Sequence, residues 1–150
     1  MYDLMIIGSG PAGISAALTA KARNLNFIWF GSRALSTKIE KAEKIMNYPG
    51  LPAVTGSEMQ SVFLKQIDDC GITITESQVN SIYDCGGYFA AGADNEIYEA
   101  KAVIMTVGMT TTREIEGEAR LLGCGVSYCA TCDGALYKNK DIAVICASPK

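Results

Sequence analysis

Two cysteines and a carboxylate stand closest together among the residues that can do chemistry. The sequence reads Cys129-Ala130-Thr131-Cys132-Asp133. Two thiols at this spacing can close a small disulfide ring and exchange two electrons, and a nearby helix N-terminus would lower a thiol pKa. Asp133 can carry the proton that accompanies thiol chemistry. A dinucleotide that stores two electrons, such as FAD, would match this dithiol in electron count.

The same cysteines also fit two kinds of metal site. Cys124, Cys129 and Cys132 have the spacing of plant-type 2Fe–2S ligands, with Cys146 as a fourth thiol. Zinc could take the same four thiols. We favour the redox pair and no metal, because a carboxylate has no role in an all-thiolate site and because Cys146 ends a predicted buried strand. The remaining cysteines are expected to be small, partly buried packing residues: Cys70, Cys85, Cys124 and Cys146.

A glycine-rich turn near the N-terminus is the second feature with chemical meaning. Residues 8–13 read GSGPAG and match the dinucleotide fingerprint G-x-G-x-x-G. Gly8 would allow the tight turn, Gly10 would let the backbone approach a pyrophosphate, and Gly13 would let the helix pack close to the sheet. The phosphates would lie on the helix N-terminus, where free N–H groups and the dipole favour anions.

One part of that fingerprint is missing. An acidic residue is expected at the end of the second strand, where it holds the ribose hydroxyls. This strand ends in Trp29-Phe30-Gly31. We therefore expect another group, such as the backbone at Phe30 and Gly31, to make the ribose contact.

The elements that must position these residues can be read from hydrophobic pattern and turn signals. An apolar strand at 2–7, a helix from Pro11 through Ala12–Arg23 and a strand at Asn26–Phe30 form a βαβ opening. Residues 32–56 are irregular, and a helix runs from Thr55 or Ser57 to about Cys70. Short strands are then expected at Ile72–Thr75, Ser77–Tyr83, Gly87–Ala91, Glu96–Glu99 and Lys101–Val107, followed by a loop at 109–120 and a strand at 141–145.

Composition excludes several classes of function. The 150 residues carry a net charge of −3 with no Lys/Arg-rich run, which argues against nucleic acid. No apolar stretch is long enough for a membrane span or a signal peptide, so we expect a cytoplasmic protein in a reducing compartment. The absence of histidine excludes Ser-His and Cys-His nucleophile pairs.

The chain resembles the low-molecular-weight thioredoxin reductase family. The resemblance rests on GSGPAG at 8–13, NYPG at 47–50, TVG at 106–108 and above all SYCATCDG at 127–134. It implies an α/β fold with a Rossmann-like FAD-binding domain in a three-layer β/β/α arrangement, into which a second nucleotide-binding-like domain carrying the CxxC is inserted. Residues 1–112 would be the first domain, lacking its C-terminal return segment, and 113–150 the start of the second.

The resemblance also implies a role for each matching residue. Cys132 would face the flavin, Cys129 would attack the disulfide of thioredoxin, and Asp133 would be the general acid–base. Family members are homodimers. The residues implied to contact FAD are Gly8, Ser9, Gly10, Pro11, Ala12, Gly13, Lys38, Asn47, Val79 (through its backbone, at the adenine), Thr106 and Gly108, to which we add Phe30 and Gly31 at the end of the second strand.

Lys38 departs from the family pattern. The family usually has Gly-Gly-Gln where this chain has Ser36-Thr37-Lys38. A lysine beside the isoalloxazine would favour a reduced, anionic flavin, whereas a solvated surface lysine is the alternative. Replacing Lys38 by glutamine tests the first interpretation through the flavin redox potential.

The last ten residues, DIAVICASPK, repeat the opening strand but not its glycines. Family members that use NADPH have a second glycine turn here, whereas this chain has Cys146 and Ser148, and Pro149 removes one N–H. We expect the NADPH site to be absent or degenerate. In this respect the chain resembles the ferredoxin-dependent flavin thioredoxin reductases, which implies reduced ferredoxin as electron donor.

Three functions stay open at this point. The first is a flavin-dependent disulfide reductase that is reduced by ferredoxin and acts on thioredoxin. The second is the same enzyme reduced by NADPH through a degenerate turn. The third is a non-catalytic FAD/CxxC redox sensor, against which Asp133 argues, because a sensor has less need of a proton relay. We also expect 150 residues to be a fragment or one of two chains, because the FAD domain needs a returning segment.

Overall fold

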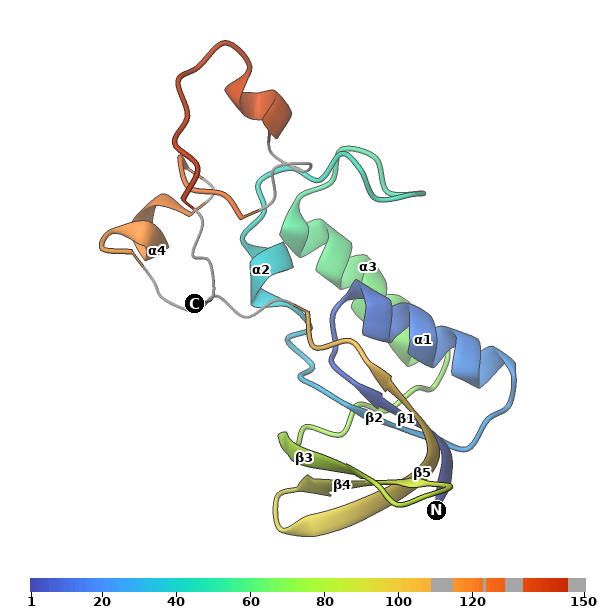
Figure 1. The fold of residues 1–150 in the computed structure, drawn as a ribbon. Coiled ribbons are helices and arrows are strands. Elements are labelled where there is room, and N and C mark those ends of the chain that lie inside the picture. The colour runs from blue at the N-terminus through green and yellow to red at the C-terminus, as the bar shows by residue number, and fades with distance from the viewer. Residues whose placement is uncertain (109–114, 123, 129–133, 146–150) are drawn as a thin grey trace.

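A five-stranded sheet is the centre of the fold. The computed structural model describes residues 1–108, 115–122, 124–128 and 134–145. The strand order is β2-β1-β5-β4-β3. β1 pairs in parallel with β2 and β5, while β3, β4 and β5 form an antiparallel meander (Figure 1). The strands are β1 (Tyr2–Ile7), β2 (Phe27–Phe30), β3 (Val79–Asp84), β4 (Phe89–Ala93) and β5 (Glu96–Met105).

A single long strand, β5, joins the parallel and antiparallel halves of the sheet. Ala100 pairs with Tyr2 of β1 on one side and with Phe89 of β4 on the other. The residues before Ala100 pair with β4, and those after it pair with β1. The prediction of two separate strands over 96–107 is therefore wrong, because partner strands on both sides keep the backbone extended through Ala100.

The two faces of β1 bury different layers, because successive side chains of a strand point to opposite faces. Leu4 and Ile6 pack beneath the helices α1 (Pro11–Ala22) and α3 (Gly56–Asp69). Met5 and Ile7 pack against small alanines of the meander, namely Ala91, Ala93 and Ala100. The meander thus covers the face opposite the helices (Figure 1), and the predicted three-layer β/β/α arrangement is confirmed.

Local signals fix the ends of both long helices. Pro11 is the first residue of α1, as predicted, and that helix ends at Ala22. Helix α3 begins after Thr55, which accepts a hydrogen bond from the Glu58 N–H, while the Glu58 carboxylate accepts one from the Thr55 N–H. This capping box satisfies two otherwise free N–H groups. Met59, Phe63 and Ile67 then form one buried stripe.

Four other expectations about elements are wrong. The irregular segment 32–56 contains a short helix, α2 (Thr37–Glu40), and the expected loop contains α4 (Glu118–Leu121). Residues 72–75 make only one bridge, between Thr75 and Phe30. Residues 141–145 form no strand, and no strand of the described residues pairs with them. Their apolar side chains are largely exposed: Ile142 68%, Val144 83% and Ile145 74%.

Candidate functional site

The turn after β1 is held by hydrogen bonds to its carbonyl groups. Gly8 has a φ of +112°, which disfavours any side chain, and a Cβ there would clash with the Thr106 carbonyl. The Gly8 carbonyl accepts hydrogen bonds from Trp29 Nε1 at 2.8 Å and from Thr106 Oγ1 at 3.0 Å. The turn is therefore fixed from β2 and from the end of β5 together.

The three glycines of the turn face different surroundings. A Cβ on Gly13 would clash with the Gly8 carbonyl oxygen. The helix can therefore lie this close to the turn only because residue 13 is glycine. A Cβ on Gly10 would have no heavy atom within 4 Å, so this position faces open space. Gly8 and Gly13 serve packing, and Gly10 leaves room for an external group.

The first turn of α1 offers free donors to such a group. Gly10 is the N-cap and provides no side-chain hydrogen bond, and the first turn contains no acidic residue. The first intrahelical bond runs from the Ile14 N–H to the Gly10 carbonyl at 3.0 Å. The N–H groups of Ala12 and Gly13 therefore precede the helical ladder. Free N–H groups, the helix dipole and the space at Gly10 together fit a pyrophosphate.

Ser9 holds the loop that follows β2. Its side chain is buried, with Oγ donating to the Leu35 carbonyl at 3.1 Å and accepting from the Ser32 N–H at 3.0 Å. A Cβ on Gly31 would lie 2.5 Å from the Ser9 Cβ, so these two segments are in close contact. The hydroxyl is thus occupied within the protein, and Ser9 can offer a ligand only its backbone.

Phe30 lies in the core. Its side chain is 1% exposed and meets the Tyr98 ring edge-on, with 5.0 Å between the ring centroids. Gly31 donates its N–H to the Thr75 carbonyl at 3.1 Å. Only the backbone of this strand end can face a ligand.

The other predicted cofactor residues lie on separate segments. Val79 is the first residue of β3 and pairs with Ala93. Asn47 is exposed, in the segment between the bridged residues Ile45 and Val54. Gly108 has a φ of +70° and follows the end of β5, close in sequence to Thr106. Thr106, by contrast, contacts the glycine turn directly, since its Oγ1 donates to the Ile7 and Gly8 carbonyls.

Lys38 lies beside the segment that leads to the cysteine pair. Its Nζ is 5.9 Å from the centre of the Tyr128 ring, and Tyr128 directly precedes Cys129. Glu43 makes a second contact from the same region, since its Oε1 accepts a hydrogen bond from Cys124 Sγ at 3.6 Å. Lys38 is itself exposed, which agrees with the alternative of a surface lysine, and its position beside the flavin stays a prediction.

The predicted redox residues Cys129, Cys132 and Asp133 lie outside the described residues, as do Cys146, Ser148 and Pro149. Of the cysteines expected to be partly buried, the three described ones, Cys70, Cys85 and Cys124, are exposed and free. That expectation is wrong for them, because each lies at a turn or helix end and not in the core. Within the described residues, no group of three or more acidic, cysteine or histidine side chains could hold a metal.

Two residues of this region were missed from the sequence. Trp29 is fully buried and hydrogen-bonds the glycine turn, and Glu76 Oε1 accepts a hydrogen bond from the Arg33 N–H at 2.7 Å. The indole N–H of a buried tryptophan needs an acceptor, which is a signal for Trp29. Glu76 gave no local signal, because its position beside residue 33 arises from tertiary contact.

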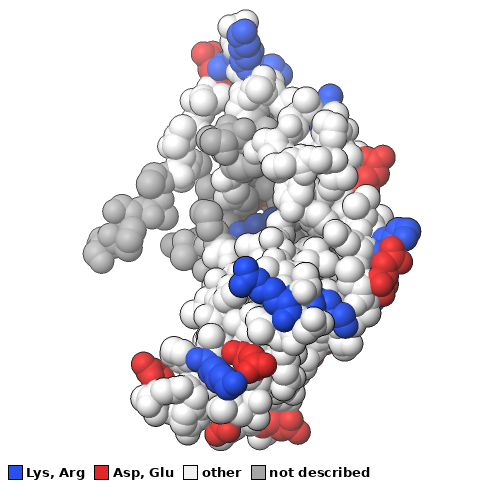
Figure 2. All heavy atoms as spheres, turned by 90° about the vertical axis from the view of Figure 1, so that its right-hand side faces the viewer, with Lys and Arg blue, Asp and Glu red and all other residues white. Residues whose placement is uncertain are grey.

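Charge on the surface is mixed in sign. Figure 2 shows basic and acidic side chains interspersed on one face of the described residues. Arg33 pairs with Asp68 at 2.7 Å, and this contact raises the pKa of Arg33 above its ordinary value. The hydrogen bond that Lys101 Nζ donates to Asp3 Oδ1 at 2.7 Å lowers the pKa of Asp3 below its ordinary value. These pairs lie on the surface and support structure rather than a reaction.

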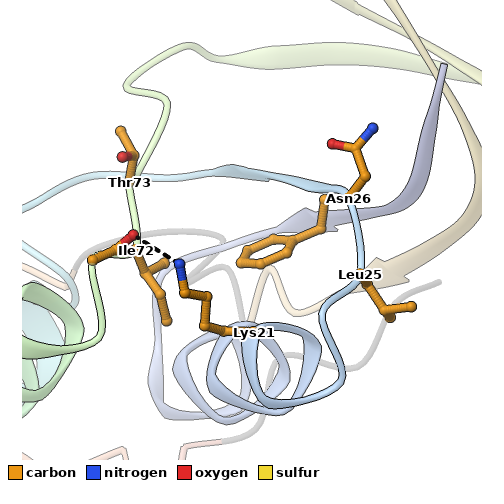
Figure 3. Close-up of a pocket in the computed structure, with 7 residues that line it drawn as sticks. Lys21, Leu25, Asn26, Ile72 and Thr73 are labelled. Atoms are coloured by element: carbon orange, nitrogen blue, oxygen red, sulfur yellow. Dashed lines mark hydrogen bonds between the residues drawn. The ribbon is translucent and has the colours of Figure 1, made fainter.

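A shallow hollow lies at the amino end of β2, away from the glycine turn. Lys21, Asn26 and Ile72 are among the residues that line it, and Lys21 Nζ donates to the Gly71 carbonyl at 3.4 Å across it (Figure 3). The glycine turn lies at the opposite, carboxyl end of the parallel strands. Ligands of open α/β sheets bind at that carboxyl end. The hollow is therefore no part of the candidate site.

No helix of the described residues is long and apolar enough to cross a membrane.

Comparison with known proteins gives consistent matches over nearly the whole chain. The family described as pyridine nucleotide-disulphide oxidoreductase matches residues 2–149. The thioredoxin reductase of Bacillus subtilis is 32% identical over 146 residues, which are 97% of this chain and 46% of that protein. The chain thus spans about half the length of the curated relatives it matches.

Two solved structures show the same fold. A ferredoxin-flavin thioredoxin reductase from Clostridium acetobutylicum is 48% identical with a TM-score of 0.72, covering 91% of this chain and 47% of that one. A thioredoxin reductase from Streptococcus pyogenes is 35% identical with a TM-score of 0.78, covering 91% of this chain and 45% of that one.

Proposed function

Because the chain belongs to the pyridine nucleotide-disulphide oxidoreductase family, we propose that the full-length protein is a flavin-dependent disulfide reductase. It passes two electrons from FAD through the Cys129/Cys132 pair to thioredoxin, and reduced ferredoxin supplies the electrons. The observation that carries this proposal is the glycine turn, in which Gly10 leaves space beside the free N–H groups of α1.

The chain's own residues account for cofactor binding. The backbone of Gly10, Ala12 and Gly13 would hold the pyrophosphate, and Trp29 and Thr106 would keep the turn in shape through the Gly8 carbonyl. The remaining predicted contacts, at Lys38, Asn47, Val79 and Gly108, are part of the same proposal. When bound, FAD supplies a two-electron store that matches one dithiol.

The two cysteines divide the disulfide exchange between them. The Cys129 thiolate attacks one sulfur of the thioredoxin disulfide, forming a mixed disulfide and releasing the other sulfur as a thiolate. Cys132 then attacks Cys129, which frees the second sulfur of thioredoxin and leaves a Cys129–Cys132 disulfide. Asp133 takes up and returns the protons. Overall, two reduced ferredoxins and two protons are consumed for each disulfide converted to a dithiol.

The choice of ferredoxin over NADPH rests on the second, glycine-free turn. Cys146 and Ser148 each add a Cβ where backbone would need to approach a pyrophosphate. Two of the structural matches, at 48% and 47% identity, are named ferredoxin-flavin thioredoxin reductases. The match to the S. pyogenes protein, which is named thioredoxin reductase with no donor stated, keeps the NADPH-dependent enzyme as the second candidate. We further propose a homodimer in the cytoplasm, in line with the family resemblance.

Anaerobic reduction of the full-length protein tests the donor. We expect reduced ferredoxin to bleach the flavin absorption rapidly, and NADPH to bleach it slowly or not at all. Rapid bleaching by micromolar NADPH would overturn the choice of donor. Turnover of thioredoxin under the same conditions separates the enzyme from a redox sensor, since a sensor would be reduced without turning over.

A cysteine variant tests the roles of the two thiols. Cys129→Ser removes the attacking thiolate, so thioredoxin reduction should stop, while binding of FAD is retained. The matched variant Cys70→Ser removes an exposed, free thiol at the C-cap of α3 and should leave turnover unchanged. Normal thioredoxin reduction by Cys129→Ser would contradict the assignment.

A further inference from the structure

We infer that Glu76 supplies the carboxylate that binds the adenosine ribose of FAD, in place of the acidic residue that β2 lacks. The inference rests on the proposed FAD-binding function and names one more residue of that site. Glu76 lies more than forty positions after the end of β2 along the chain, so its role follows from the fold alone.

Backbone pairing brings the segment before Glu76 to the end of β2. After α3 the chain passes through Ile72 and Thr73 (Figure 3) and then runs parallel to β2. The Thr75 N–H donates to the Trp29 carbonyl at 2.8 Å, and the Gly31 N–H donates to the Thr75 carbonyl at 3.1 Å. Residue 76 is thereby fixed one step beyond the carboxyl end of β2.

A continuous series of contacts then links Glu76 to the glycine turn. Glu76 Oε1 accepts from the Arg33 N–H at 2.7 Å. The neighbouring residue, Ser32, donates its N–H to Ser9 Oγ at 3.0 Å, and Ser9 lies within the turn itself. In dinucleotide-binding folds the ribose lies between the pyrophosphate at the helix N-terminus and the end of the second strand. Glu76 is placed at that second point.

The carboxylate of Glu76 has capacity for a ligand. It is exposed, and no lysine or arginine of the described residues forms a salt bridge with it, although the Arg33 guanidinium is near enough to attract its charge. The nearby Arg33 guanidinium is directed to Asp68, with Nη2 at 2.8 and 2.7 Å from the two carboxylate oxygens. A carboxylate has about four acceptor positions, and the Arg33 N–H uses one. The remaining oxygen can accept from a ribose hydroxyl.

Two variants separate ribose binding from a purely structural role. Glu76→Gln keeps an oxygen that can accept from the Arg33 N–H but removes the charge, whereas Glu76→Ala removes both. Glu99→Gln is the matched control, because Glu99 is an exposed glutamate on β5, in the meander. The measurement is the dissociation constant of FAD for the apo form of the full-length protein.

We expect Glu76→Gln to weaken FAD binding about tenfold or more, since hydrogen bonds to a charged group are the stronger ones. FAD analogues lacking the adenosine 2′- or 3′-hydroxyl should bind the wild type more weakly than FAD does. That preference should shrink in Glu76→Gln for at least one of the two analogues. Glu99→Gln should match the wild type.

Two results would overturn the inference. If Glu76→Gln binds FAD and both analogues like the wild type, Glu76 only closes the loop at Arg33, and the proposed FAD function stands. If the wild type binds no FAD, the proposed function fails and the inference fails with it. The two failures are distinguished by the wild-type measurement alone.

Discussion

The region with the glycine turn and the region around the cysteine pair are built in different ways. Among the described residues, every buried hydrophobic side chain belongs to the segment from Leu4 to Ala100. In the described parts of 115–145, Glu118 is the buried residue, and Val144 is 83% exposed. The candidate FAD site therefore rests on packed strands and helices. The second region makes surface contacts instead, from Tyr128 to Lys38 of α2 and from Cys124 to Glu43, which lies after α2.

This difference between the two regions predicts which substitutions should change stability and which should change chemistry. In the first region, substitution of Gly8 or Gly13 should disturb the packing of the turn, whereas substitution of Gly10 should change the space for a ligand alone. In the second region, a change should alter chemistry or local contacts with little effect on the folded state.

Gly13→Ala should produce the largest loss of stability. Its Cβ would clash with the Gly8 carbonyl oxygen, which is backbone and cannot move without disturbing the turn. We expect a loss of about 2–3 kcal/mol in the free energy of unfolding, measured by urea denaturation. Gly134→Ala is the control in the second region, because its Cβ would meet nothing within 4 Å. Equal effects of the two changes would remove the contrast.

Gly10→Ala should separate cofactor binding from folding. Gly10 has a φ of −73°, which alanine adopts readily, and its Cβ would point into open space. Stability of the apo protein should stay within about 0.5 kcal/mol of the wild type. FAD affinity should fall about tenfold or more, because the Cβ occupies the space meant for the pyrophosphate. Unchanged FAD affinity would show that the phosphates lie elsewhere.

Tyr128→Leu should loosen the contact between the second region and α2. The Lys38 ammonium loses the ring beneath it, an interaction worth about 0.5 kcal/mol at an exposed site. Alkylation of Cys124, followed by peptide mass spectrometry, should become about twofold faster. Tyr128→Phe keeps the ring and should behave like the wild type, and Cys70 serves as internal reference. A wild-type rate in Tyr128→Leu would mean that the ring contact does not hold this segment.

Glu58 should contribute a small pH dependence within the first region. The Thr55 N–H, foremost among its partners, lowers the pKa of Glu58 below its ordinary value of 4.5. The folded state therefore gains stability from the capping box above the unfolded-state pKa and loses it as pH falls through the lower folded-state pKa. Urea denaturation between pH 6 and about 3 should show a shallower decline for Glu58→Gln than for the wild type. Identical slopes would contradict this role.

Sequence reasoning succeeded where the cause is local. The strand at 2–7, the turn at Gly8–Gly10 and the helix beginning at Pro11 follow from hydrophobic pattern and turn chemistry. The predictions were wrong where an element depends on pairing with a distant strand. Residues 141–145 have the composition of a strand but no partner strand among the described residues, whereas β5 extends through Ala100 because it has two partners. Glu76 reaches Arg33 only through the pairing of Thr75 with β2, which no local pattern reveals.

The flavin content of the purified full-length protein tests the central claim most directly. We expect flavin absorption bands, one FAD per chain (identified by chromatography after its release) and no acid-labile sulfide. Protein that carries no flavin after reconstitution with FAD would contradict the cofactor site at the glycine turn. Acid-labile sulfide with a cluster spectrum in place of flavin bands would assign Cys124, Cys129, Cys132 and Cys146 to an iron–sulfur cluster instead.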